Sequence, residues 1–389
     1  MAPHTSFPAT RPAVTDLPGL SRALSAALAG GPPVLPADWP AGLTPLPGTA
    51  LAVPTSGSTG TPKWVCLGAE AIRAGAAASA ARLGGAGHWL LALPARHIAG
   101  LNVVARAALA GAELCALPPG PFTADAFVAG AAALPAEPRY VSLVPAQLHR
   151  LVAAGGPALA ALAEFAAVLV GGAAPSPGLM AAARAAGVNL VETYGAAETG
   201  GGVVYDGVPL DGARVGLGAD GRIELAGPML ALGYAGSVPA GGFIARPDGR
   251  WFVTADLGAW LPDGRLAVLG RADNGLLSGG VTVHPEAVEA VLAGLPEVAG
   301  AIVLGLPHPE WGHEVTALVV GRPGGIGQVE PQRLLEAVRE AVKGALGAAH
   351  APRAIGLVAE LPQVAPGKPD RRAALEAAQK LNAAGGLTR

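Results

Sequence analysis

The strongest constraint on the fold is an alternation of short apolar runs and alanine-rich helical patterns between about residues 50 and 205. The apolar runs cover residues 88–93, 140–144, 166–170 and 188–192. This alternation is typical of β-α units with buried parallel strands and predicts an α/β fold. Because ligands bind in the loops that follow such strands, we expect a functional site at their carboxyl ends.

The pattern changes further along the chain. Residues 207–269 hold short strands separated by Gly, Pro and Asp turns, which predict hairpins or a small barrel. Beyond Arg271 the periodicity predicts helices from Pro285 and Pro331 and strands near residues 299–306, 314–320 and 354–359. A chain of 389 residues favours more than one domain. We expect a large N-terminal domain of α/β layers with a small β-barrel-like part, residues 1–270, a hinge at 271–274, and a small mobile α+β C-terminal domain, residues 275–389.

Composition limits the partners. The formal net charge is −2 and the 26 basic residues are spread along the chain, so nucleic acid and anionic membranes are disfavoured. Charged residues and Gly-Pro pairs interrupt the apolar stretches, so no membrane span is expected. The first residues lack a signal-peptide pattern, and the two cysteines, Cys66 and Cys115, indicate a reducing cytoplasm and are interpreted as packed side chains. We expect small-molecule partners and, as the default assembly, a homodimer.

Residues 55–63, TSGSTGTPK, favour phosphate binding. Glycines allow backbone N–H groups to turn inward, the hydroxyls donate hydrogen bonds, and Lys63 supplies positive charge. The spacing differs from the Walker P-loop, because Gly57 and Gly60 lie three apart and Pro62 precedes the lysine. The alternative interpretation is a flexible Ser/Gly linker, although the apolar, strand-like run before it disfavours that interpretation.

Several stretches together resemble the adenylate-forming enzymes, which include acyl-CoA synthetases, peptide-synthetase adenylation domains and luciferases. The stretches are residues 55–63, 171–174, 194–199, 254–258 with 270–273, and 366–368, in the family's order. The resemblance covers nearly all of the chain after residue 50. It implies a two-step reaction: a carboxylate attacks the α-phosphate of ATP to give an acyl-adenylate and pyrophosphate, and a thiol, usually of coenzyme A, then displaces AMP.

The resemblance also implies the roles of single residues. Lys368 and Glu198 would be catalytic. The acid carboxylate and the α-phosphate are both anions, so their approach requires positive charge, and Glu198 would contact a Mg²⁺ ion held largely by phosphate oxygens. Asp256 would accept hydrogen bonds from the ribose hydroxyls. The remaining nucleotide and coenzyme A contacts would be Thr55, Ser56, Gly57, Ser58, Thr59, Gly60, Lys63, Gly172, Ala173, Ala174, Tyr194, Gly195, Thr199, Arg271, Gly279 and Gly280.

Some of these positions allow a second interpretation. Ala197 stands where the family usually has Thr, so Thr199 or water would replace the missing hydroxyl. Asp273 occupies the hinge position, about which the small domain of the family rotates between the two steps. Trp311 would contact coenzyme A or pack as an ordinary aromatic residue. Lys368 alone would be a surface charge, and its Pro-Gly-Lys context favours the catalytic interpretation.

Residues 93–101, 142–150 and 199–207 look like the o-succinylbenzoate-CoA ligases of menaquinone synthesis, especially the short actinobacterial kind. The resemblance implies o-succinylbenzoyl-CoA as the product. Residues 89–109 and 140–151 contain no Asp or Glu to pair with a substrate ammonium, which disfavours amino acids as substrates. The alternatives are a CoA ligase for another aryl or acyl acid, or a non-catalytic adenylate-binding module.

The substrate of that subfamily carries a second carboxylate, which needs cationic or hydroxyl partners. The candidates are His97, Ser142 and Arg150, with Arg106 less favoured, and Gly171 would line the acid site. His97 would also stand at the acyl or coenzyme A gate, although it could simply cap a strand end. Arg150 could extend from its helix to the surface.

Overall fold

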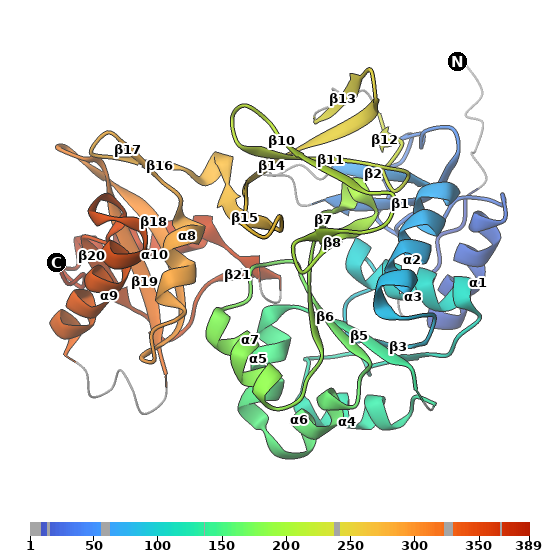
Figure 1. Ribbon diagram of the computed structural model, residues 1–389, viewed down its shortest axis with the longest axis horizontal. Coiled ribbons are helices and arrows are strands. Elements are labelled where there is room, and N and C mark those ends of the chain that lie inside the picture. Colours follow the sequence, from blue (N-terminus) through green and yellow to red (C-terminus); the bar gives the residue numbers. More distant parts are fainter. Residues whose placement is uncertain are drawn as a thin grey trace.

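The computed structural model describes residues 9–13, 16–55, 63–135, 137–236, 242–322, 330–365 and 368–389. Its largest sheet has the order β4-β3-β5-β6-β7-β8-β9 (Figure 1). The strands are β3 (His88–Leu91), β4 (Leu114–Ala116), β5 (Arg139–Leu143), β6 (Ala167–Val170), β7 (Leu190–Ala196), β8 (Gly201–Tyr205) and β9 (Val208–Pro209). From β4 to β7 the pairing is parallel, which confirms the β-α expectation, whereas β8 and β9 add antiparallel strands.

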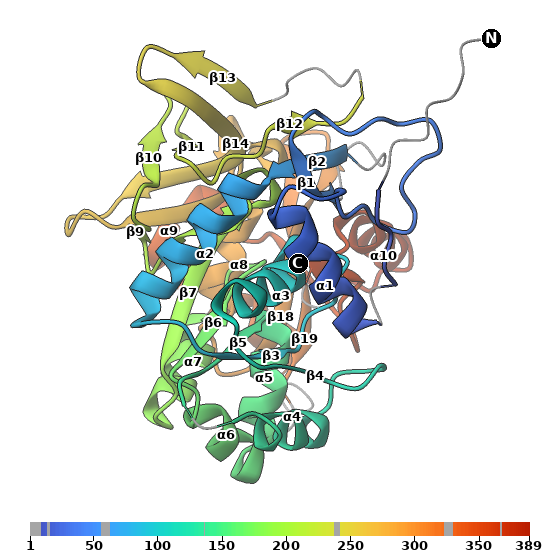
Figure 2. The same ribbon diagram turned by 90° about the vertical axis from the view of Figure 1, so that its right-hand side faces the viewer.

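Helices cover both faces of this sheet. One face carries α1 (Leu17–Leu28), α2 (Ala69–Leu83) and α3 (Ile98–Ala110), which lie together in Figure 2, and the other carries α4 (Ala124–Ala132), α5 (Pro145–Ala154), α6 (Gly156–Ala163) and α7 (Pro177–Ala185). Successive strand residues point to opposite faces. Thus Ala167 and Leu169 of β6 pack in the first core, whereas Val168 and Val170 pack in the second. Such a doubly covered sheet requires uninterrupted apolar strands, as the sequence has.

Two further sheets complete the larger part of the molecule. Strands β1 (Thr49–Thr55), β2 (Lys63–Gly68) and β12 (Gly233–Tyr234) form a small antiparallel sheet. The expected hairpins form an antiparallel sheet of β10 (Arg214–Leu217), β11 (Arg222–Ala226), β13 (Phe243–Arg246), β14 (Gly249–Trp260) and β15 (Leu266–Arg271). β15 pairs with β14 and leads to the 3-10 turn η2 (Ala272–Asn274).

The chain after η2 builds its own sheet and cores. The elements are β16 (Leu276–Ser278), β17 (Val281–Val283), α8 (Pro285–Leu292), β18 (Val298–His308), β19 (Gly312–Gly321), α9 (Pro331–Leu346), β20 (Ala354–Leu357), β21 (Gln363–Ala365), β22 (Lys368–Pro369) and α10 (Arg371–Ala383). Leu334, Val338 and Val342 of α9 are buried at the expected spacing. Within the described residues, no helix combines the length and the apolar character that crossing a membrane requires.

Candidate active site

The segments after β6 and β7 meet at the carboxyl edge of the parallel strands. Residues 171–174 follow β6, and β7 ends in the 3-10 turn η1 (Ala197–Thr199). Gly172 has a φ of +82°, a left-handed conformation that disfavours other residues. A Cβ at Gly171 would clash with the Thr193 hydroxyl, and one at Gly195 would clash with the Gly201 carbonyl. Glycine at these three positions is therefore required by a left-handed backbone conformation or by close packing.

A tyrosine and a carboxylate face each other beside this edge. The Tyr194 hydroxyl donates a 2.8 Å hydrogen bond to Asp256 Oδ2, and Arg271 Nη1 lies 3.8 Å from Asp256 Oδ1. Burial raises the pKa of the Asp256 carboxyl, although the Tyr194 hydrogen bond and the Arg271 charge oppose this. Burial and the Asp256 charge also raise the pKa of Tyr194. Asp256 is thus a partly buried carboxylate, 25% exposed at its side chain, that accepts from Tyr194 and lies beside Arg271.

A second set of side chains connects strands β2 and β12 of the small antiparallel sheet to the η1 turn. Tyr234 donates a 2.7 Å hydrogen bond to Glu198 Oε1, and Lys63 Nζ lies 5.4 Å from the centroid of the Tyr234 ring. The pairing of β12 with β2 carries Tyr234 to this place. Burial and the Glu198 charge raise the pKa of the Tyr234 hydroxyl. Lys63 and Glu198, which the sequence analysis selected from segments far apart, therefore share Tyr234 as a neighbour.

Thr199 has a different part in this turn. Its side chain is buried. The hydroxyl accepts a hydrogen bond from Ala196 N at 3.0 Å and donates one to the Gly201 carbonyl at 2.8 Å. The expectation that Thr199 supplies the hydroxyl missing at Ala197 does not fit this geometry, because both functions of the hydroxyl are used by the backbone. Thr199 instead fixes the turn that presents Glu198.

The acid-site candidates are not all brought together. Arg150 is exposed on α5, and its Nη1 donates to the Phe122 carbonyl at 3.2 Å, before α4 on the outer helical layer. The substrate role of Arg150 stays a prediction. His97 is the exposed N-cap residue of α3, where Arg96 Nε lies 3.1 Å from its Nε2. Ser142 is half-buried in β5, on the same face as Tyr140.

Arg106 is a second candidate cation. Its Nη2 donates to the Tyr205 hydroxyl at 3.0 Å, and its guanidinium lies 5.2 Å from the Trp89 ring centroid. One turn earlier on α3, Asn102 donates to the Gly200 carbonyl. The face of α3 that carries Asn102 and Arg106 therefore lies along β8, from the η1 turn to Tyr205. Arg106 is eight residues beyond Ile98, roughly 12 Å along the helix. Arg106 on α3 and Arg150 on α5 therefore both remain candidate partners for a second carboxylate.

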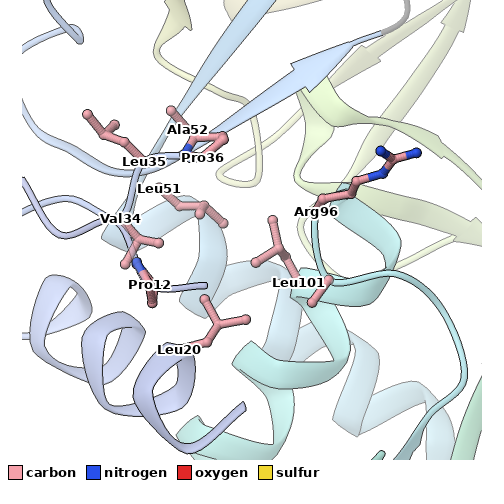
Figure 3. A pocket seen from close by; sticks show the side chains of 10 residues that line it. Pro12, Leu20, Val34, Leu35, Pro36, Leu51, Ala52, Arg96 and Leu101 are labelled. Atoms are coloured by element: carbon pink, nitrogen blue, oxygen red, sulfur yellow. The ribbon is translucent and has the colours of Figure 1, made fainter. Parts of the chain in front are cut away.

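Two cavities adjoin α3. One, of about 300 Å³, is lined by Arg106, Trp89, Tyr140 and mainly small residues of α2. The other, of only about 20 Å³, lies between α1, β1 and the start of α3, where the side chains in Figure 3 are mostly apolar and Arg96 stands at the edge. The smaller cavity has room for about one water molecule and is a packing gap. The larger one is also lined by Leu83, Gly85, Ala86 and Gly87, which precede β3, so it lies toward the amino edge of the parallel strands.

The C-terminal candidates lie on two sheets: Gly279, Gly280 and Trp311 adjoin the five-stranded sheet of β16 to β20, and Lys368 is in the two-stranded sheet of β21 and β22. Gly279 and Gly280, with φ of +58° and +81°, form the turn between β16 and β17, and a Cβ on Gly279 would lie 2.8 Å from the Trp311 ring. The Arg353 guanidinium lies 3.7 Å from the centroid of that ring, so Trp311 packs against Arg353. Lys368 begins β22, and its side chain is outside the described part of the chain, as are Ser56, Gly57, Ser58, Thr59 and Gly60.

The comparisons with known proteins fit this arrangement. The pattern of the AMP-binding enzyme family matches residues 44–235, and that of the AMP-binding enzyme C-terminal domain matches residues 287–368. The chain belongs to the AMP-binding enzyme family, which confirms the resemblance to adenylate-forming enzymes. It is 46% identical over 328 residues, 83% of each chain, to a protein of Mycobacterium tuberculosis named "Probable 2-succinylbenzoate--CoA ligase".

Solved structures agree in fold. ATP-bound MatB from Rhodopseudomonas palustris has a TM-score of 0.71 at 26% identity, covering 86% of this chain and 69% of that chain. The o-succinylbenzoate CoA synthetase MenE from Bacillus subtilis, in complex with its acyl-adenylate intermediate, has a TM-score of 0.69 at 23% identity, covering 90% and 80%. The α/β fold expected from the sequence is thereby confirmed.

Proposed function

We propose that the chain is a 2-succinylbenzoate-CoA ligase that consumes ATP and coenzyme A and releases AMP and pyrophosphate, a step of menaquinone synthesis. The observation that carries this proposal is the 46% identity to a relative of that name over 83% of both chains. The partly buried Tyr194–Asp256 pair and the Lys63–Tyr234–Glu198 group support it. We further propose that the enzyme is cytoplasmic and homodimeric. Light scattering of the purified protein would test the homodimer, and cell fractionation would test the location.

ATP would bind along the carboxyl edge of the parallel strands. The adenine would lie between residues 172–174 and the Tyr194 ring, and the ribose hydroxyls would donate to Asp256, with Arg271 beside it. The segment from Thr55 to Lys63 would hold the phosphates that leave as pyrophosphate. Thr55 and Lys63 are register partners in β1 and β2, and the Thr55 hydroxyl lies 3.2 Å from the Lys63 carbonyl. The two ends of this segment are therefore held opposite each other.

Glu198 would be the protein contact of Mg²⁺. Among the residues that the structure describes, no three His, Cys, Asp or Glu side chains gather as a metal site. A single carboxylate fits Mg²⁺, which is usually bound by one or two carboxylates together with phosphate oxygens and water. The ion would neutralise phosphate charge, and Tyr234 would hold the Glu198 carboxylate in place for it.

The reaction would use the two parts of the chain in turn. We propose that residues 1–270 bind ATP and the acid, and that residues 275–389 move about a hinge at 271–274. In the first step Lys368 would neutralise the acid carboxylate and the α-phosphate while the new C–O–P linkage forms and pyrophosphate leaves. After rotation about Asp273, the thiol of coenzyme A would pass Gly279 and Gly280 and displace AMP. His97, exposed at the start of α3, would stand at the acid entrance.

The second carboxylate of the acid would be bound by Arg106. The α3 face that runs from Ile98 through Asn102 leads from the η1 turn to this guanidinium. The Tyr205 hydroxyl, which also lies 2.9 Å from Ser79 Oγ, fixes Arg106 in the interior. An elongated aromatic diacid would therefore place its activated carboxylate at the turn and its other carboxylate at Arg106, with Gly171 and Ser142 lining the ring.

The test offers 2-succinylbenzoate, benzoate, octanoate and a mixture of amino acids to the purified protein with ATP, Mg²⁺ and coenzyme A. We expect thioester formation and pyrophosphate release with 2-succinylbenzoate, well above the other acids. Efficient turnover of benzoate or octanoate with no use of the diacid would contradict the substrate assignment. Absence of pyrophosphate with every acid would favour the non-catalytic adenylate-binding module instead.

Replacing Tyr234 by Phe should weaken metal-dependent nucleotide use. The change removes the hydrogen bond to Glu198, and a bond to a charged group contributes enough for roughly a tenfold loss. We expect kcat/KM for ATP to fall about tenfold and the Mg²⁺ requirement to rise, with little change in Tm. Tyr140→Phe is the matched control, because its hydroxyl bonds the Leu83 and Gly85 carbonyls instead. Equal effects of the two substitutions would argue against a site role for Tyr234.

A further inference from the structure

The segment that carries Lys368 is anchored three residues later by Arg371. Arg371 Nη1 donates to the Val303 carbonyl at 2.9 Å, and its Nη2 lies 3.1 Å from Glu286 Oε1 and 2.9 Å from Glu289 Oε2. The side chains of Arg371 and Glu289 are only 26% and 17% exposed, so solvent screens this ion pair less than a surface pair. One guanidinium therefore ties the first turn of α10 to both α8 and β18.

The two carboxylates are themselves held in place. Glu289 Oε1 accepts from the Val303 backbone N at 2.7 Å, next to the carbonyl that Arg371 uses. Burial raises the pKa of Glu289, and the Arg371 charge opposes this. The neighbouring Asp370 caps α10 by accepting from Ala373 N at 3.0 Å. The chain directly after Lys368 and Pro369 is thus fixed by both ion pairs and a helix cap.

Glu286 connects this anchor to the hinge. The Oε1 atom that accepts from Arg371 also accepts from Asn274 Nδ2, in the η2 turn. Its Oε2 atom is buried against Gly270 and has no hydrogen-bond partner among the described atoms. A single carboxylate therefore contacts the hinge and the base of the Lys368 segment at once.

We propose that Arg371, held by Glu286 and Glu289, is a positioning residue that fixes the place of Lys368 for the adenylation step. We further propose that Glu286 couples the position of Lys368 to the hinge at Asn274. This inference rests on the proposed adenylation function and on the part that Lys368 takes in it. Misplacement of a reacting group by about 1 Å can cost on the order of 10²-fold in rate. The loss should be confined to adenylation, because Lys368 acts in that step alone.

The experiment measures both half-reactions in Arg371→Lys, Arg371→Ala and the matched control Arg372→Ala. Arg372 is 92% exposed at its side chain and pairs only with Glu376 in the next turn. Arg371→Lys keeps the charge and loses the forked geometry that serves two carboxylates and a carbonyl together. Arg371→Ala removes the anchor and leaves Glu289 without its counter-charge, so Tm is recorded for every variant.

We expect pyrophosphate release from 2-succinylbenzoate and ATP, without coenzyme A, to fall about tenfold in Arg371→Lys and about 10²-fold in Arg371→Ala. Thioester formation from supplied acyl-adenylate should stay within about twofold of wild type, and Arg372→Ala should change neither step. If Arg371→Ala does not fold, Arg371→Lys alone decides. Unchanged adenylation, or equal loss of both steps in a variant that melts like wild type, would overturn the inference while leaving the proposed function intact. A wild-type protein that releases no pyrophosphate would overturn both.

Discussion

Lys368→Ala should abolish most acyl-adenylate formation and spare thioester formation from supplied adenylate. Attack of a carboxylate on the α-phosphate brings two anions together, and loss of one preorganised charge partner in such a step costs on the order of 10²–10³-fold. The second step breaks the bond to AMP instead and does not need the same lysine. Pyrophosphate release without coenzyme A, and thioester formation from synthetic acyl-adenylate, separate the two steps.

Lys380→Ala is the matched control for this experiment. Lys380 is an exposed residue in the last turn of α10, on the same C-terminal part of the chain. We expect it to leave both steps unchanged. Equal losses of the two steps in Lys368→Ala, with Tm preserved, would contradict the assigned role, because they would place the lysine in a function common to both.

Arg106→Met should remove the preference for a diacid. The substitution retains a long apolar side chain beside Trp89 but leaves the second carboxylate without a charged partner in a half-buried site. A charge-assisted hydrogen bond of this kind contributes up to a few kcal/mol, so kcat/KM for 2-succinylbenzoate should fall about 10²-fold, chiefly through KM. Any activity with monocarboxylic acids should change much less.

Arg150→Met is the comparison that decides between the two arginines. Arg150 is exposed on α5 and donates to the Phe122 carbonyl, so we expect its removal to leave kcat/KM nearly unchanged. Because Arg106 also contacts the Tyr205 hydroxyl, Arg106→Lys is included in case the methionine variant is unstable. A larger loss in Arg150→Met than in either Arg106 variant would restore the interpretation drawn from the sequence.

Local patterns predicted most of the fold. The apolar runs became the parallel strands, and the helix predicted from Pro285 is α8, Pro285–Leu292. Buried strands and amphipathic helices carry their signal in neighbouring residues, which is why these elements were readable. Motif order likewise selected Glu198 and Asp256, which accept hydrogen bonds from Tyr234 and Tyr194. Their roles in nucleotide binding stay predictions.

Contacts between distant segments were not predictable in the same way. Tyr234 reaches Glu198 only because β12 pairs with β2, and no local pattern specifies that pairing. Thr199 looked like a free hydroxyl but turns inward to its own backbone. The choice between Arg106 and Arg150 stays a prediction, because it depends on helix orientation, which decides which side chain faces the interior. The spacing of Ile98, Asn102 and Arg106, four residues apart, is the local signal that these three side chains share one face of α3.

A single-turnover experiment tests the adenylation chemistry most directly. Enzyme in excess over 2-succinylbenzoate is mixed with ATP and Mg²⁺ without coenzyme A, the products are quantified, and coenzyme A is then added. We predict one pyrophosphate and one acyl-adenylate for each acid consumed, followed on addition of coenzyme A by equal amounts of AMP and thioester. Formation of ADP and phosphate, or thioester that appears without a prior adenylate, would contradict the proposed reaction.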